Sequence, residues 1–84
     1  MHESSLIADL IAKVEETARR NGAAKVVSVE ISLGALEPAG EDHLREHFNA
    51  AAPGTMLAGA ELRFTRNPDP LSSGLNLQSV ELDR

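Results

Sequence analysis

The sequence predicts an α+β fold, a two-layer sandwich in which a three-stranded sheet carries two helices on one face. Two stretches have apolar residues at helical spacing, three have them at alternate positions, and Gly or Pro residues separate these stretches. The 84 residues are 42% hydrophobic and 25% charged, which is typical of one small domain. The order of the strands in the sheet is left open.

A first helix is expected because its apolar residues recur three or four positions apart, as on one face of a helix. These residues are Leu6, Ile7, Leu10, Ile11, Val14 and Ala18. Ser4 or Ser5 can cap the start of this helix, and Asn21-Gly22 supplies a left-handed stop. The predicted helix therefore begins almost at the N-terminus.

Apolar and polar residues alternate over residues 25–33, and this alternation predicts the first strand. Its core side is expected to hold Val27, Val29, Ile31 and Leu33, and its other side Ser28, Glu30 and Ser32. The residues Glu61, Arg63 and Thr65 of the next strand should share that second side, which would meet solvent or a partner. A second helix follows a loop with Pro38. Its predicted buried stripe is Leu44, Phe48 and Ala51, and Pro53-Gly54 ends it.

The second strand is predicted from Ala60, Leu62 and Phe64, which alternate with polar residues. The run Asn67-Pro68-Asp69-Pro70 then forces a turn, since each proline lacks a backbone donor. The third strand begins near Leu75. Its apolar residues change phase, from Leu75 and Leu77 to Val80 and Leu82, and this change predicts a β-bulge at Gln78-Ser79.

The composition excludes several classes of function. The formal net charge is −5 and the acidic residues are dispersed, so no basic stripe suits nucleic acid. Cysteine is absent, which excludes disulfides and thiolate zinc sites. The apolar stretches are shorter than the ~20 residues of a membrane span, and no secretory signal pattern is present. A cytoplasmic protein with neither a nucleic-acid nor a membrane partner is expected.

The first three residues, Met1-His2-Glu3, form a candidate metal site. A terminal amine, the amide nitrogen of His2 and its imidazole Nδ1 can bind one ion in two fused chelate rings. The amide nitrogen of Glu3 completes a square plane of nitrogen donors, which Ni(II) and Cu(II) favour. Met1 should be retained, because removal of the initiator residue generally requires a small second residue. The sequence therefore predicts Met1, His2 and Glu3 as metal ligands, with the Glu3 side chain outside the ligand plane.

A second candidate is the pair His43 and His47, whose i,i+4 spacing lets two imidazoles on one helix face grip a divalent ion. Charged residues surround them in the sequence and no third ligand is evident, so a solvated helix face is the favoured interpretation. No nucleophile stands beside a base, and no Gly-rich phosphate loop is present. The sequence therefore lacks both of these catalytic patterns.

Met1-His2-Glu3 followed directly by an amphipathic helix resembles the start of the HypA/HybF family, nickel metallochaperones of hydrogenase maturation. Four later stretches extend the resemblance over nearly the whole chain: Ile31-Ser32-Leu33-Gly34-Ala35-Leu36, the helix around Leu44 and Phe48, Gly59-Ala60-Glu61-Leu62, and Gly74-Leu75-Asn76-Leu77 through Leu82. The resemblance implies that Met1, His2 and Glu3 hold Ni(II) as a transient cargo for a [NiFe] hydrogenase. It implies that the chain is not an enzyme and that it has two partners, the hydrogenase large subunit and a HypB-type GTPase.

Two departures from the family pattern lead to an alternative. The family carries a zinc module with two Cys-x-x-Cys pairs between its last two strands, where this chain has only the short loop 67–73. Ala35 stands where the family commonly has Glu. Residues 1–84 thus resemble a single HypA-like nickel-binding domain without structural zinc. The alternative function is a protein-interaction module that docks on a hydrogenase subunit or maturation factor and binds no metal.

Overall fold

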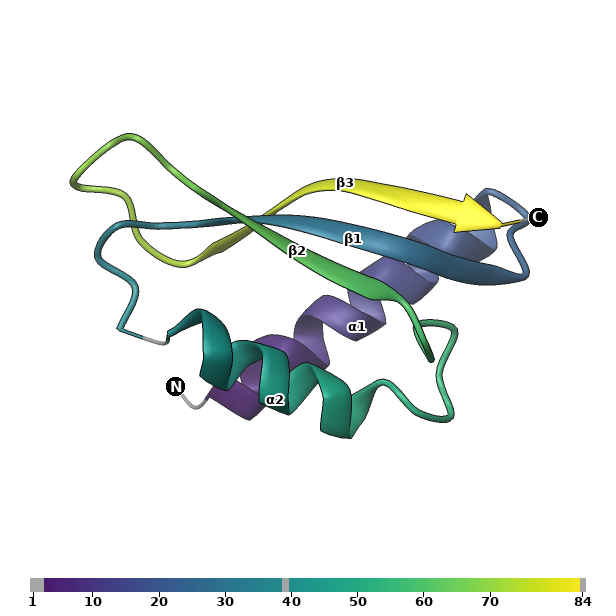
Figure 1. Ribbon diagram of the computed structural model, residues 1–84. Coiled ribbons are helices and arrows are strands. Elements are labelled where there is room, and N and C mark those ends of the chain that lie inside the picture. Colours follow the sequence, from purple (N-terminus) through teal and green to yellow (C-terminus); the bar gives the residue numbers. More distant parts are fainter. Residues whose placement is uncertain (1–2, 39, 84) are drawn as a thin grey trace.

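The predicted fold class is confirmed by the computed structural model, which describes residues 3–38 and 40–83. The chain forms α1 (Glu3–Arg20), β1 (Lys25–Leu33), α2 (Glu41–Ala51), β2 (Glu61–Arg66) and β3 (Leu75–Asp83). Both helices lie against one face of the three-stranded sheet, as Figure 1 shows. Since each element buries one apolar side, this arrangement places the core between the helical layer and the sheet.

The sheet has the order β2-β1-β3, with β1 in the centre. Strand β1 is parallel to β2 and antiparallel to β3. A parallel pair needs a crossover connection that returns the chain to its starting end, and α2 supplies it between β1 and β2. As a result, both edges of the sheet belong to the C-terminal half of the chain.

Two β-bulges interrupt the pairing of β1 with β3. Glu30 is opposite Ser79 but Ile31 is opposite Leu77, so Gln78 is the extra residue, and the predicted bulge is confirmed. The other bulge was not predicted. Val26 is opposite Leu82 and Ser28 is opposite Glu81, so Val27 is the extra residue. It changes the phase of the strand, so that Val26 is buried and Val27 is 38% exposed. The prediction that Val27 faces the core is therefore wrong.

The core is formed by aliphatic residues around one aromatic ring. Its largest fully buried side chains are Phe48, Ile7, Ile31, Leu44, Leu57, Val14, Val26 and Val29. After Leu44 and Phe48, the third buried residue of this stripe is Ala52, the cap that directly follows α2, and the predicted Ala51 is exposed. Ala52 keeps helical backbone angles and donates its N–H to the Phe48 carbonyl, so the stripe continues at i+4 spacing. Leu57, in the turn after α2, was not predicted because no periodicity surrounds it.

The ends of α1 agree with the prediction at one terminus only. Gly22 has φ +67°, the left-handed conformation expected of the residue that stops the helix. At the other terminus the helix already includes Glu3, so Ser4 and Ser5 lie inside its first turn. The prediction that one of them caps the helix is wrong, because no Gly or Pro there prevents helical backbone.

The outer face of the sheet is only partly exposed. Ser28 and Ser32 of the central strand are buried, contrary to the expectation that they meet solvent. Ser28 donates a hydrogen bond of 3.1 Å to Glu81 of the neighbouring strand β3. Arg63 donates to Glu61 at 2.9 Å, and this hydrogen bond raises the pKa of Arg63. The face is thus a polar surface with its small residues in the middle.

Residues 67–74 join β2 to β3 as a short loop fastened to the end of β1. The N–H of Asn67 donates to the Leu33 carbonyl at 3.0 Å, and the N–H of Gly34 donates to the Gly74 carbonyl at 2.9 Å. These bonds hold the first and last residues of the loop against the same end of the central strand. The loop is therefore an ordered part of the domain.

Candidate metal site

The predicted metal site lies at the start of α1. Met1 and His2 are outside the described residues, and Glu3 is the first residue of the helix. The first four N–H groups of a helix have no acceptor within the helix. The amide nitrogen of Glu3 is therefore not committed to an intrahelical hydrogen bond. Using this nitrogen as a metal donor would leave the hydrogen bonds of α1 intact.

Two helices start at the end of the domain where α1 begins. Figure 1 shows that α1 and α2 begin at the same end of the domain, and the two helices pack against each other. The partial positive charge at a helix N-terminus stabilises negative charge. The start of α1 thus favours negative charge.

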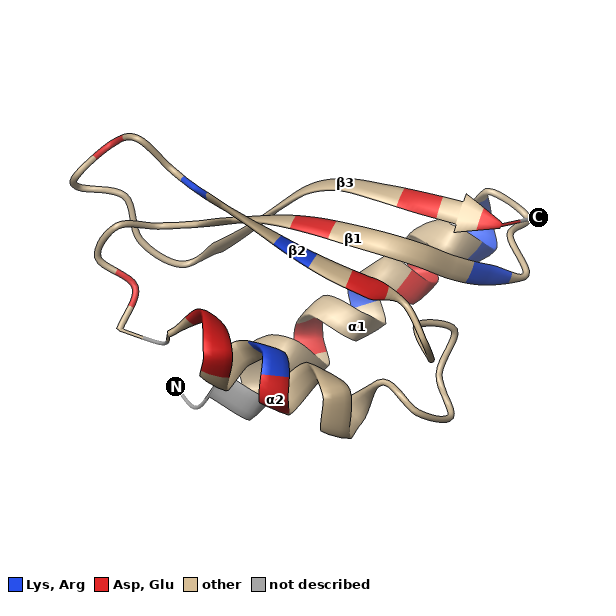
Figure 2. Ribbon diagram, viewed as in Figure 1, with Lys and Arg blue, Asp and Glu red and all other residues tan. Residues whose placement is uncertain are grey.

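Acidic residues occupy the first turn of α2, as Figure 2 shows. Glu41 and Asp42 line a polar cavity with Gly40, His43 and Arg66, where the start of α2 meets the end of β2. The two carboxylates also suit the partial positive charge at the start of a helix. Arg66 was not predicted to take part in any site, because no local pattern marks a lone arginine at a strand end. The cavity brings side chains of both charges close to the start of α2.

His43 and His47 do lie on α2 at the predicted spacing, with His43 exposed and His47 half-buried. Among residues 3–38 and 40–83, no group of three or more His, Cys, Asp or Glu side chains could hold a metal ion. The described part of the chain thus adds no third ligand to the histidine pair.

Within residues 3–38 and 40–83, no helix is long and apolar enough to span a membrane.

Comparison with known proteins finds the same family in a family model and in individual relatives. A family model described as hydrogenase/urease nickel incorporation, metallochaperone, hypA matches residues 1–72. The hydrogenase maturation factor HypA of Rhizobium leguminosarum bv. viciae is 41% identical over 66 residues, which are 79% of this chain and 58% of that protein. HypA 2 of Bradyrhizobium diazoefficiens is 38% identical over 82 residues, covering 98% and 73% of the two chains.

Solved structures agree in fold. The solution structure of the Ni metallochaperone HypA from Helicobacter pylori matches with a TM-score of 0.81 and 20% sequence identity, covering 99% of this chain and 98% of that one. At this identity the likeness concerns the fold alone. The chain spans somewhat more than half the length of the Rhizobium relative.

Proposed function

Because this chain belongs to the HypA family of hydrogenase maturation factors, we propose that it is a nickel carrier that binds Ni(II) through its first three residues. The observation that carries the proposal is the family match, which begins at residue 1 and includes Met1-His2-Glu3 and the helix behind them. The nickel ion is the cargo of the protein and not a group used in catalysis.

The chemistry requires four nitrogen donors in one plane. Met1 supplies its amine, His2 its amide nitrogen and imidazole, and Glu3 its amide nitrogen. A square-planar nitrogen field suits Ni(II), and donors on three consecutive residues can supply it without rearrangement of a core. Because α1 starts at Glu3, the ligand set ends where the rigid scaffold begins. The ion would then be held at the tip of the domain, accessible for transfer.

We expect His2→Ala to abolish tight nickel binding, since the variant loses the imidazole donor. The test is calorimetric titration of the untagged protein with Ni(II), together with the visible absorption of square-planar nickel. The native chain should bind one ion per molecule. The variant should bind at least about 100-fold more weakly, because even the loss of a group that only supports a ligand typically costs about 10–100-fold in affinity. The His43→Ala/His47→Ala double variant is the matched control and should bind as the native protein does.

Three results would contradict the carrier function: no binding by the native chain at neutral pH, unchanged binding by His2→Ala, or loss of binding in the His43→Ala/His47→Ala control. An N-terminal extension of a few residues is a further check, because it removes the free amine of Met1 and leaves the folded domain unchanged. It should reduce nickel affinity as strongly as His2→Ala does. Retained affinity would mean that the amine is not a ligand.

Nickel affinity should also fall as the pH is lowered. A terminal amine has a reference pKa of about 8 and must lose its proton to bind, so protons compete with the metal. Below about pH 7 the apparent affinity is expected to drop by roughly tenfold or more per pH unit, since imidazole and amide protons compete as well. Titrations at pH 6, 7 and 8 on the untagged protein measure this slope, and a flat profile would exclude the amine as a donor.

We propose that the recipients are those the family resemblance implies, a hydrogenase large subunit and a HypB-type GTPase. A second candidate function is a docking module that binds no metal. It is favoured by the loop 67–74, a short closed connection where the resemblance places a zinc module. The nickel titration separates the two candidates, because a docking module would show no square-planar nickel signal in the native protein.

A further inference from the structure

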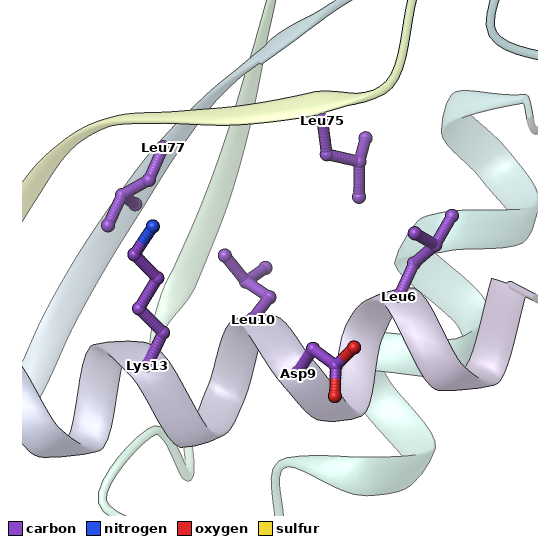
Figure 3. Close-up of a pocket in the computed structure, with 6 residues that line it drawn as sticks. All are labelled: Leu6, Asp9, Leu10, Lys13, Leu75 and Leu77. Atoms are coloured by element: carbon purple, nitrogen blue, oxygen red, sulfur yellow. The ribbon is translucent and has the colours of Figure 1, made fainter.

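The two faces of the sheet differ in chemistry. On the side of the helices, apolar side chains reach the edge of the sheet, where a groove lies between α1 and β3 (Figure 3). The apolar residues that line this groove are Leu6, Leu10, Leu75 and Leu77. The opposite side, which we call the polar face, consists of rows of side chains that cross the strands in the order β2-β1-β3. Neither helix covers the polar face, as Figure 1 shows.

The polar face carries more negative charge than positive charge. Its first row is Glu61, Ser28 and Glu81, and its second row is Arg63, Glu30 and Ser79. Figure 2 shows acidic segments on all three strands. Arg63 donates hydrogen bonds of 3.1 and 2.9 Å to Glu61, so this carboxylate is neutralised. Within residues 3–38 and 40–83, neither Glu30 nor Glu81 forms an ion pair. Two carboxylates of the face are thus without a bound cation.

These two carboxylates lie beside one small residue. Glu81 is opposite Ser28, and Glu30 is two positions beyond Ser28 on the central strand. The two glutamates are therefore diagonal neighbours, with their Cβ atoms about 7–8 Å apart. Ser28 is 5% exposed, and its hydroxyl already donates to Glu81. Because serine is short, a long cationic side chain from outside can reach between the two carboxylates and bind both.

A second serine of the polar face offers a hydroxyl without a partner. Ser32 lies between Thr65 and Asn76 in the next row and is 6% exposed. In the part of the chain that the structure describes, its side chain forms no hydrogen bond, yet no fully enclosed side-chain N or O atom lacks a partner. The hydroxyl is therefore reachable from outside, on the side away from the buried Ile31 and Leu33. An incoming acceptor would satisfy it.

We propose that the polar face docks a basic segment of a protein partner. One lysine or arginine side chain of the segment lies between Glu30 and Glu81, and an oxygen of the segment accepts a hydrogen bond from Ser32. The charge complementarity is the reason for this choice, since the same carboxylates repel nucleic acid and anionic lipid. Ser28 and Ser32 are four positions apart on one strand, about 13 Å, so a segment spans the distance and a small cation does not.

The docking is tested by nuclear magnetic resonance titration of the isotope-labelled, metal-free protein with a capped peptide of alternating lysine and alanine. Low ionic strength keeps the screening of charges weak. The amide signals of residues 28–32 and 79–81 should shift most. Glu30→Gln/Glu81→Gln should weaken binding by roughly tenfold, because two charge contacts are lost. Ser32→Ala should weaken it by about twofold to fivefold, the effect of one hydrogen bond.

Asp9→Asn/Glu46→Gln is the matched control, because it also removes two negative charges, at exposed positions on the two helices. It should bind the peptide as the native chain does, and the dispersion of the amide signals checks that every variant is folded. Four results would overturn the proposal: no shifts, shifts spread equally over the helices, an equal loss in the control, or binding of spermidine as tight as that of the peptide, which would mean a small cation only. Because no nickel is used, none of these results depends on the carrier function.

Discussion

Gly34→Ala is expected to destabilise the domain by about 2–4 kcal/mol, since it combines overpacking with the loss of loop hydrogen bonds. A Cβ atom on Gly34 would lie 2.5 Å from Cα of Ser73 and 2.6 Å from its backbone C and N. These atoms belong to the backbone, so no side-chain rotation can relieve the contact. The loop 67–74 would have to move away, which breaks the bond from Gly34 to Gly74.

Urea unfolding followed by far-ultraviolet circular dichroism measures this effect, and the absence of Trp and Tyr rules out intrinsic fluorescence from those residues. Gly40→Ala is the control, because its added Cβ meets nothing within 4 Å and its φ is −79°. The control should cost less than about 1 kcal/mol, the effect of a weaker helix cap. A Gly34→Ala variant as stable as this control would show that the loop can shift freely.

Phe48→Ala should cost about 3–5 kcal/mol, the usual range for removing a buried aromatic ring. Phe48 is 2% exposed and is the largest of the fully buried side chains. A domain of this size has a total stability of roughly 4–13 kcal/mol. The substitution is therefore expected to remove a large share of the total stability, because the small aliphatic neighbours cannot close the cavity.

The same unfolding experiment tests this substitution against two others. Phe48→Leu keeps most of the apolar volume and should lose only about 1–2 kcal/mol. Leu71→Ala removes a side chain that is 80% exposed and should stay within about 0.5 kcal/mol of the native protein. If Phe48→Ala were no less stable than Phe48→Leu, the ring would not be the centre of the core.

The elements were predictable because their evidence is local. The apolar phase change after Leu77 marks the bulge at Gln78, whereas the bulge at Val27 leaves no mark, since Val26 and Val27 are the same residue type. Strand order depends on pairing between distant segments, and the alternation within each strand carries no information about its neighbours. Leu57 was missed for a related reason, as a turn residue becomes buried only when the layers close over it.

The candidate metal site was also only partly predictable from the sequence. Its donors are a terminal amine, two amides and one imidazole, and the order of the first three residues is enough to name them. That prediction stays a prediction. The surroundings of the site could not be read locally, because the start of α2 reaches that end of the domain only through the packing of the two helices. The groove beside β3 is likewise made by segments more than sixty residues apart in the sequence.

The way in which the loop 67–74 is fastened has a consequence for how the domain can be remodelled. Arg66 and Leu75 are both opposite Leu33, on its two sides, so the strand ends that flank the loop are about 10 Å apart. A folded unit whose two termini are also about 10 Å apart could be inserted at this loop, or removed from it, without disturbing the sheet or the helical layer. Doubling the length of a flexible insert would cost only about 0.6 kcal/mol. The same junction is thus a natural place to graft a reporter or a second binding unit.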